Sequence, residues 1–305
     1  MASPRITEPG DHRPHPAHAQ DPCDVTTVVD TDRYPIHRTD TPDWRTSAAA
    51  VRSALDRTGC AVLAGFIRPE HLDRLRAEGD RIAPDAHYET ARVNVYNTDV
   101  DDLDPDLARE HPARVVMDRG NAFVARDRIP EDLTIHRLYR DPRVHAFLAA
   151  CAGLPALYEL ADPLAGLCLN VIPPGRSHPW HFDTNEIAIS LLTRAPSTGG
   201  RFEYCPDIRA TDRENTGDVA DVLAGRRTEL VHGLALTPGD LQLFRGRYSL
   251  HRVTPVGGTR ARHTAIFSFS TRPGVVGTEE RTRQLFGRVL SEHRAAQPQV
   301  DDLLI

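Results

Sequence analysis

Lysine is absent from this sequence: all 37 basic residues of the 305-residue chain are arginine. Without a lysine amine, no Schiff base can form with pyridoxal phosphate or with an aldol substrate. The G-x-x-x-x-G-K-[ST] phosphate loop and the ATP-binding lysine of protein kinases are excluded for the same reason. A G-x-G-x-x-G dinucleotide motif is also missing. The sequence therefore excludes several large groups of nucleotide- and cofactor-dependent proteins.

Cysteine is scarce, and no two cysteines form a C-x-x-C pair. An odd number of widely spaced cysteines is typical of free thiols in a reducing compartment, and it argues against a disulfide framework or a zinc–thiolate site. We therefore expect packing roles for all five, which are Cys23, Cys60, Cys151, Cys168 and Cys205.

Long apolar runs and an excess of positive charge are missing as well. No segment is apolar over the length that a membrane span requires, and the N-terminus lacks the apolar region of a secretory signal. The net charge of -6 argues against a general nucleic-acid binder, because phosphate neutralisation needs a basic face. We expect a cytoplasmic protein without nucleic-acid or membrane partners, and the sequence leaves its oligomeric state open.

The chain divides by composition into a tail and one large domain. Residues 1–43 are rich in Pro, His, Asp and Thr, so we expect a disordered or loosely packed tail. The domain, 44–305, begins with a helical part, 44–156, in which an irregular polar segment spans 84–130. Helices are expected at 47–57, 69–82 and 144–152, and a closing helix at 279–291.

Between residues 157 and 273 the pattern changes to short β-rich segments. LCLNVI, RFEYCP, LQLFRG, SLHRVTPV and ARHTAIFSFS are separated by turns rich in Gly and Pro. Many short strands of this kind indicate an antiparallel sandwich or barrel. The expected fold class is mainly β with flanking helices (α+β), with a jelly-roll, cupin-like core.

An H-x-D pair at 181–183 is the first chemical signal. On a strand, residues two apart share a face, so His181 and Asp183 can reach one ion. A second H-x-D pair, His71 and Asp73, lies in a helical pattern, where such side chains diverge. His251, in another β segment, can supply a third ligand. Two imidazoles and one carboxylate on one side of a metal are typical of non-haem iron(II) oxygenases; the alternative is a set of polar barrel residues bonded to each other.

A carboxylate-binding pair follows on the next β segment. Arg262 lies beyond the GGTR turn, and Thr264 shares its face. Arginine offers a permanently charged, bidentate fork for a buried carboxylate, and a hydroxyl can add a further hydrogen bond. Arg260 shares the same face nearer the turn and is the alternative, and a plain surface arginine is the simplest interpretation.

With these motifs in place, residues 157–273 resemble the iron(II)/2-oxoglutarate oxygenases of the double-stranded β-helix fold. Within them the chain is similar to the bacterial subgroup of free-amino-acid hydroxylases and radical halogenases. The stretches that carry the resemblance are YELADPLAGLCLN, HPWHFDTNEIAISLL, GGRFEYCPDIR, LTPGDLQLFRGRYSLHRVTPVGG and R-H-T. The resemblance implies Fe(II) bound by His181, Asp183 and His251, with 2-oxoglutarate and O2 as cosubstrates. It also implies that Arg262, Thr264 and Asn170 contact 2-oxoglutarate.

The resemblance further implies an oxidoreductase, a dioxygenase that couples oxidative decarboxylation of 2-oxoglutarate to activation of a C–H bond. Halogenating relatives have a small residue where this chain has Asp183, so hydroxylation is the expected outcome. Radical cyclisation, for example to a cyclopropane, and desaturation are the alternatives. We expect a small amino-acid-like substrate from specialised (secondary) metabolism, such as antibiotic biosynthesis.

Substrate contacts are expected from residues beside the iron motif and from the irregular segment 84–130. The predicted set is His178, Thr184, Asn185, Arg92 and Tyr96. Trp180 suits a pocket wall and a core position equally, and Arg114 can also enter from the irregular segment. Two other classes stay open: a cupin-type metalloenzyme without 2-oxoglutarate, which would not need Arg262, and a non-catalytic binding module.

Overall fold

Two antiparallel sheets form the centre of the computed structural model, which describes residues 24–89, 91–98 and 103–295. The larger sheet has seven strands in the order β1-β13-β9-β16-β7-β5-β2. Their bounds are β1 Cys60–Leu63, β2 His87–Tyr88, β5 Ala122–Val124, β7 Leu167–Ile172, β9 Ala188–Arg194, β13 Leu241–Phe244 and β16 Arg262–Phe267.

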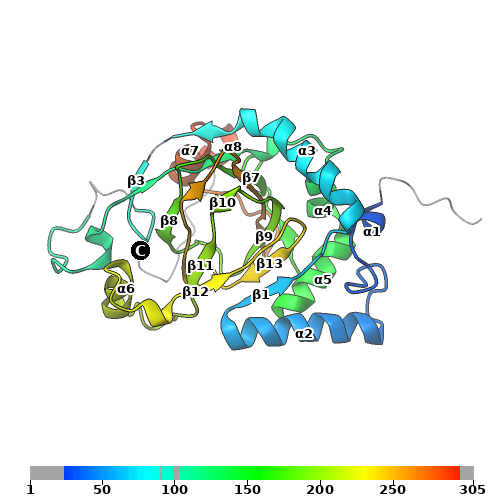
Figure 1. The fold of residues 1–305 in the computed structure, drawn as a ribbon, viewed down its shortest axis with the longest axis horizontal. Helices are drawn as coiled ribbons and strands as arrows, with labels where there is room; N and C mark the ends of the chain where they lie inside the picture. Colours follow the sequence, from blue (N-terminus) through cyan, green and yellow to red (C-terminus); the bar gives the residue numbers. More distant parts are fainter. Residues whose placement is uncertain (1–23, 90, 99–102, 296–305) are drawn as a thin grey trace, which may run out of the picture.

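The smaller sheet has the order β12-β11-β14-β8 and faces the larger one around a shared interior (Figure 1). Its strands are β8 His178–His181, β11 Phe202–Cys205, β12 His232–Leu234 and β14 Leu250–Val253. Three short pairs complete the strands: β3 Ala91–Val93 with β4 Met117–Arg119, β6 Tyr158–Glu159 with β17 Phe269–Ser270, and β10 Thr198–Gly199 with β15 Val256–Gly257. This arrangement confirms the predicted jelly roll.

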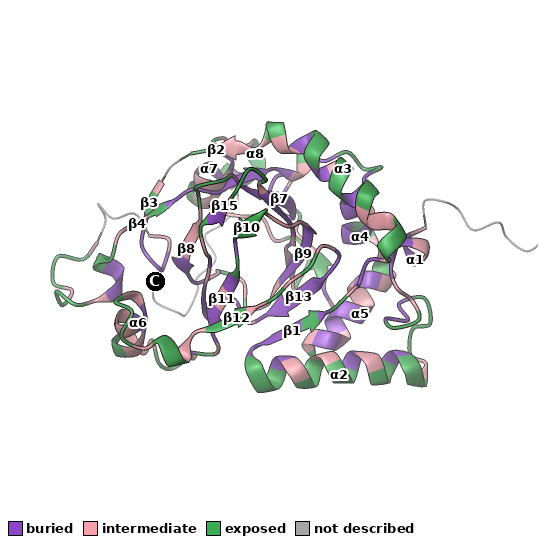
Figure 2. Ribbon diagram, in the orientation of Figure 1, coloured by how far each residue is buried: buried purple, intermediate pink, exposed green. Residues whose placement is uncertain are grey.

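The first five helices cover the outer face of the larger sheet and bury its apolar side chains, whereas the sixth lies beside the smaller sheet (Figure 2). In chain order the helices of the described residues are α1 Val25–Val28, α2 Pro42–Thr58, α3 Leu72–Ile82, α4 Thr134–Arg140, α5 Pro142–Ala152, α6 Thr216–Leu223, α7 Glu279–Phe286 and α8 Ser291–Ala295. Short 3-10 turns span Pro69–His71, Ala83–Asp85, Pro112–Arg114, Arg126–Arg128 and Thr228–Leu230. No helix of the described residues is both long and apolar enough to cross a membrane.

Helix α2 shows how local sequence sets these elements. The Thr41 hydroxyl accepts the N–H of Trp44, and Pro42 stands at the first helical position, where its missing N–H costs nothing. Gly59 ends the helix in a left-handed conformation, φ 66°, which a residue without a Cβ adopts most easily. The helix then packs on α5 and β1, so the chain passes directly from its end into the larger sheet.

The tail predicted for residues 1–43 is too long. Residues 24–43 are built into the domain: Val25, Val28, Val29, Tyr34 and Ile36 are all buried in the main apolar cluster. Residues 1–23, including Cys23, lie outside the described part of the chain. The physical reason for the error is that a few well-placed apolar side chains outweigh a polar average composition.

Two other expectations differ from the structure. The closing helix expected at 279–291 is two helices, because Gly287 ends α7 with φ 67° and α8 starts only at Ser291. The segment 84–130, expected to be irregular, contributes β2 and β5 to the larger sheet and the β3–β4 hairpin beside it. The four cysteines in the described residues are free and buried, as predicted for 60, 151, 168 and 205.

A buried histidine–aspartate pair anchors the C-terminal helices. The imidazole of His293 on α8 lies 3.2 Å from a carboxylate oxygen of Asp162, and both side chains are fully buried. Asp162 also accepts the N–H groups of Leu164 and of Gly277, just before α7. Since the Nδ1 atom of His293 accepts the N–H of Leu290, its proton is on the nitrogen that faces Asp162.

Replacing His293 with alanine should destabilise the protein by about 1–3 kcal/mol, because the buried carboxylate loses a hydrogen-bond donor that water cannot replace. Urea unfolding monitored by circular dichroism measures this change. Arg294→Ala, an exposed position on the same helix, is the matched control and should leave the unfolding midpoint unchanged. Equal midpoints for the two variants would show that the pair contributes nothing to stability.

Candidate metal centre and active site

His181, Asp183 and His251 come together at the edge of the smaller sheet. His181 ends β8 and lies directly opposite His251 of β14 in the strand pairing, and Asp183 follows β8 by two residues. Asp183 Oδ1 lies 3.6 Å from His181 Nε2, and Oδ2 lies 3.6 Å from His251 Nε2. One ligand atom from each residue falls within 4.8 Å of the others. These distances are short enough for the three side chains to bind one metal ion.

Backbone carbonyls orient both imidazoles. The Nδ1 atom of His181 lies 2.8 Å from the carbonyl oxygen of Pro179, and that of His251 lies 2.9 Å from the carbonyl oxygen of Ser249. A carbonyl can only accept, so each Nδ1 carries the proton and donates it. Each Nε2 is then unprotonated, and its lone pair is directed toward Asp183. An imidazole must be in this tautomer to bind a metal ion through Nε2.

The electrostatics fit a divalent cation. Burial lowers the pKa of His181 well below its usual value, assisted by the neighbouring His178 and His251, so this imidazole is neutral. Burial by itself raises the pKa of Asp183, but the neighbouring imidazoles of His251 and His181 outweigh it and lower the pKa to about 2. Neutral imidazole with an ionised carboxylate is the donor set that suits iron(II) with positions left open.

Close packing sets the position of Asp183. Its N–H donates to the carbonyl of Gly246 at 3.1 Å. A Cβ atom at residue 246 would lie only 2.9 Å from the Cβ and Cγ atoms of Asp183, so any larger residue would displace the carboxylate. Phe244 meets the His251 ring edge-on with centroids 4.8 Å apart, which excludes water from that side.

His178 belongs to the same site because of a β-bulge. His251 pairs with His181 and Val253 pairs with His178, so β8 contains one residue more than β14 over this stretch. The extra residue brings His178 onto the face of His181, where the two rings stack at 3.8 Å. Burial, and then the positive charge of Arg119, lower the pKa of His178 well below its usual value. The structure thus brings this predicted substrate residue next to the metal ligands.

The predicted cosubstrate residues lie on two paired strands of the larger sheet. Arg262 begins β16, and Thr264 pairs with Asn170 of β7. The Arg262 guanidinium donates to the Thr264 hydroxyl, is 4% exposed, and has no ion-pair partner among the described residues. Burial lowers the pKa of Arg262 to about 10. A buried guanidinium without a carboxylate is costly, and a carboxylate ligand at this place offsets that cost.

Two neighbouring observations sharpen this assignment. Asn170 accepts a hydrogen bond from Asn121 at 3.1 Å, and the amide oxygen of Asn121 is buried without a partner in the described structure. Arg260, the alternative to Arg262, is exposed in the turn before β16. The feature that fits an anion such as 2-oxoglutarate is therefore the buried guanidinium of Arg262, beside Asn170 on the paired strand, whereas Arg260 faces solvent.

The other predicted substrate residues are not gathered at the metal. Tyr96 stacks on Phe182 with centroids 5.8 Å apart, and Phe182, next in sequence to His181, faces the other side of β8. Trp180 is buried in this same outer cluster, so it is a core residue. Arg92 and Thr184 are exposed, and Asn185 is half-buried beside the iron motif.

Arg114 has a structural role instead of a role in the pocket. It is exposed and donates to backbone carbonyls of its own loop, at Pro105 and Leu107. Two other arginines, Arg119 of β4 and Arg281 of α7, are neighbours of the site and were not predicted from the sequence. No local motif distinguishes them from the other arginines, since only the tertiary fold brings them there.

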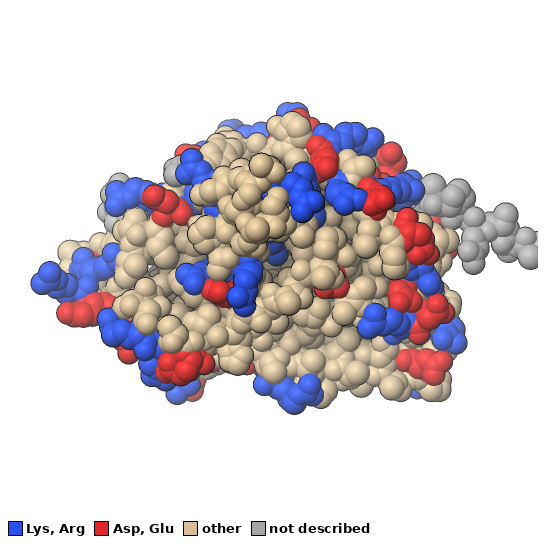
Figure 3. All heavy atoms as spheres, viewed as in Figure 1, with Lys and Arg blue, Asp and Glu red and all other residues tan. Residues whose placement is uncertain are grey.

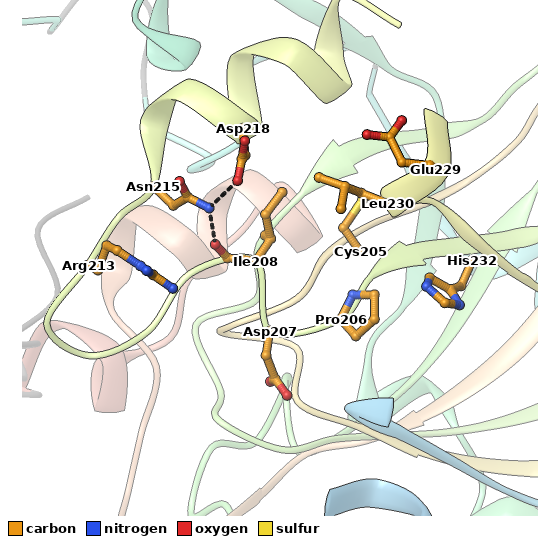
Figure 4. Close-up of a pocket in the computed structure, with 10 residues that line it drawn as sticks. All are labelled: Cys205, Pro206, Asp207, Ile208, Arg213, Asn215, Asp218, Glu229, Leu230 and His232. Carbon is orange, nitrogen blue, oxygen red and sulfur yellow. Dashed lines mark hydrogen bonds between the residues drawn. The ribbon is translucent and has the colours of Figure 1, made fainter. Parts of the chain in front are cut away.

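A separate cavity of about 250 Å³ lies on the outer side of the smaller sheet, between β11 and α6 (Figure 4). Several of its polar groups are paired: Asp218 accepts from Asn215 and Arg227, and Arg227 also bonds Glu229. None of its lining residues is one of the three candidate metal ligands. It is distinct from the candidate metal centre.

Comparison with solved structures supports the fold. A non-haem alpha-ketoglutarate-dependent carbocyclase, SnoK from nogalamycin biosynthesis, superposes with a TM-score of 0.50 at 15% identity, over 79% of this chain and 92% of that one. A 2OG-Fe(II) oxygenase from Burkholderia pseudomallei gives 0.47 at 16% identity, over 75% and 92%. A prolyl hydroxylase from Trichoplax adhaerens gives 0.48 at 13% identity, over 75% and 94%. No curated protein matches the sequence.

The chain therefore has the fold of an alpha-ketoglutarate-dependent oxygenase and carries a His-Asp-His donor set on it. The sequence model of one family in particular, described as Halogenase D, matches residues 44–284. The chain belongs to this halogenase D family. The donor set of His181, Asp183 and His251 fits the expected iron(II), and 2-oxoglutarate and O2 stay the predicted cosubstrates.

Proposed function

We propose that this oxygenase hydroxylates an unactivated C–H bond of a small amino-acid-like substrate. His181, Asp183 and His251 would bind the iron, while Arg262, Thr264 and Asn170 would bind 2-oxoglutarate. The observation that carries the proposal is the combination of the His-Asp-His triad with a buried arginine that has no ion pair in the described residues. A cupin-type enzyme without 2-oxoglutarate, or a non-catalytic binding module, would not need a buried arginine without an ion pair.

The residues of the chain bind and orient rather than transfer protons. When bound, iron(II) would activate O2, which is the oxidant, and 2-oxoglutarate would supply two of the four electrons that O2 accepts and become succinate and CO2; the substrate C–H bond would supply the other two. Arg262 would hold the distal carboxylate through a charge-assisted bond, with Thr264 as a second donor. The apolar side chains around His251, Phe244 and Phe202, would keep water from the metal ligands.

Asp183 favours hydroxylation over halogenation, although the family description refers to a halogenase. In halogenating relatives a small residue at this position leaves room for a halide at the metal. Here the carboxylate lies between the two imidazoles, and the close approach of Gly246 supports it there. A ligand at this place would occupy the position that the halide needs, so the oxygen-transferring outcome is the one this site supports.

Product mass under 18O2 tests the reaction type. Hydroxylation should add one labelled oxygen to the substrate and put one into succinate, and added chloride or bromide should give no halogenated product. Loss of two hydrogens without label in the substrate would instead identify cyclisation or desaturation. The Asp183→Ala variant serves as the control, since it should lose the labelled product together with its carboxylate ligand. A halogenated product from the unmodified chain would overturn the proposal.

A further inference from the structure

Two arginines beside the metal centre carry positive charge that no described residue neutralises. Arg119 ends β4, and Arg281 lies on α7, in segments that are far apart in the sequence. Both lower the pKa of His178, the ring that stacks on His181, and Arg281 also acts on Asp183. The geometry agrees: the N–H of Gly120, next to Arg119, donates to the carbonyl of Ser177, next to His178, at 3.1 Å, and Arg119 and Arg281 both bond Gln284.

Arg119 is buried with most of its donors unused. It is 3% exposed, and one NH2 group donates to the backbone carbonyl of Gln284 at 3.0 Å. Its Nε and Nη1 atoms are buried without any hydrogen-bond partner. Burial, and then repulsion from Arg281, lower its pKa to about 10. Two buried donor groups of this arginine therefore have no acceptor. Because a buried donor without a partner costs free energy, binding of an acceptor there is favourable.

Arg281 lies on α7, the second-last helix of the described residues. It lies one turn before Gln284, donates to the side chain of that residue, and so shares the helix face that meets Arg119. Its charge also has no ion-pair partner within the described residues; Glu280 and Asp183 attract it only from beyond ion-pair distance. Gln284 therefore bonds both arginines with neutral oxygen atoms and leaves their charges uncompensated.

The charge balance of the site indicates the nature of the substrate. Arg119, Arg262 and Arg281 have no ion-pair partner among the described residues, and Asp183 is the one carboxylate among the candidate metal ligands. Iron(II) and the 2-oxoglutarate dianion cancel each other, so two positive charges remain after both have bound. A substrate with a free ammonium at its far end would raise this excess, whereas one with two acidic groups would lower it. Arginine side chains also lie around the hollow near the centre of the face in Figure 3.

We propose that Arg119 and Arg281 form a recognition site for acidic groups, and that the substrate is an amino acid with a second carboxylate. This inference rests on the proposed function and names its substrate class. Arg119 and Arg281 offer guanidinium forks to the two carboxylates. Because Arg281 belongs to α7, a substrate bound to it would also connect α7 to the barrel.

Calorimetric titration of the manganese(II)–2-oxoglutarate complex, which does not turn over, tests this proposal. The probes are L-2-aminoadipate, L-norleucine and L-lysine, which have equal chain length but end in a carboxylate, a methyl group and an ammonium. L-Glutamate and L-aspartate extend the acidic series. We expect the best acidic probe to bind at least about 10-fold more tightly than norleucine, with lysine weakest. Equal or tighter binding of lysine, or no binding by any acidic probe, would overturn the proposal.

The variant Arg281→Gln should weaken binding of the best acidic probe by about 10- to 100-fold and leave norleucine unaffected. Arg283→Gln is the matched control, because Arg283 is exposed on the same helix and pairs with Glu279. Equal effects of the two substitutions would refute a role for Arg281. Succinate formation from 2-oxoglutarate separates the two claims: if it persists while the acidic probes fail, only the acidic-substrate proposal falls, and if it is absent, the proposed function itself fails.

Discussion

Replacing His181 or His251 with alanine is expected to abolish turnover and to weaken iron(II) binding by more than about 100-fold while the fold stays intact. Loss of a residue that only orients a ligand already costs about 10- to 100-fold in metal affinity, so loss of a ligand should cost more. Each imidazole forms one hydrogen bond, to the carbonyl of Pro179 or of Ser249, so stability should change little. Iron content after dialysis and succinate formation measure the effect.

His71→Ala is the matched control for this experiment. His71 and Asp73 form the other H-x-D pair of the chain, but they lie at the start of α3, where a metal site is not formed by described residues. This variant should bind iron and form succinate like the unmodified protein. Retention of iron by both His181→Ala and His251→Ala would show that the metal lies elsewhere.

The jelly roll could be predicted from the sequence because its signal is local. Short runs rich in apolar residues between Gly and Pro turns indicate strands such as β7, β9 and β16, and each run is long enough to be recognised by itself. The strands β2 and β5 have only two and three residues and are too short for such a pattern. They exist because β7 offers a free edge to β5, and β5 in turn pairs with β2, which is a tertiary effect.

The candidate metal ligands could be predicted for a similar reason. Residues 181 and 183 share a face through the period of a strand, and His251 lies in a segment with an obvious strand pattern. Sequence reasoning left Trp180 open between core and pocket wall and placed Tyr96 in the pocket, because it does not decide which face a side chain occupies. Both belong to the outer cluster around Phe182, on the opposite side of the sheet from His181.

Arg119 and Arg281 could not be predicted from local pattern at all. One ends a three-residue strand in a segment that looked irregular, and the other lies on a helix that was expected to run on past Gly287. Their common feature, an unpaired charge beside the metal ligands, arises only when α7 packs against the barrel. The substrate side of an active site is therefore less predictable than its metal, because its residues come from unrelated segments.

Replacing Arg262 with alanine is the second change with a large expected effect. The loss of a charge-assisted bond to the distal carboxylate of 2-oxoglutarate should cost about 2–3 kcal/mol of cosubstrate binding and raise the required concentration accordingly. Iron(II) affinity should be nearly unchanged, since Arg262 lies on β16 and the candidate metal ligands belong to or adjoin the strands of the smaller sheet. Succinate formation as a function of 2-oxoglutarate concentration, with iron binding measured in parallel, tests both statements.

Arg260→Ala is the control for Arg262, because Arg260 is exposed two residues earlier in the preceding turn. It should leave the 2-oxoglutarate requirement unchanged. Arg262→Lys should recover only part of the loss, since an ammonium keeps the charge but not the bidentate fork that carboxylates favour. Thr264→Val should show a smaller effect of about 1 kcal/mol, from one neutral donor. If Arg260→Ala raised the requirement and Arg262→Ala did not, the cosubstrate would be held from the turn and not from β16, and the buried guanidinium would need another anion.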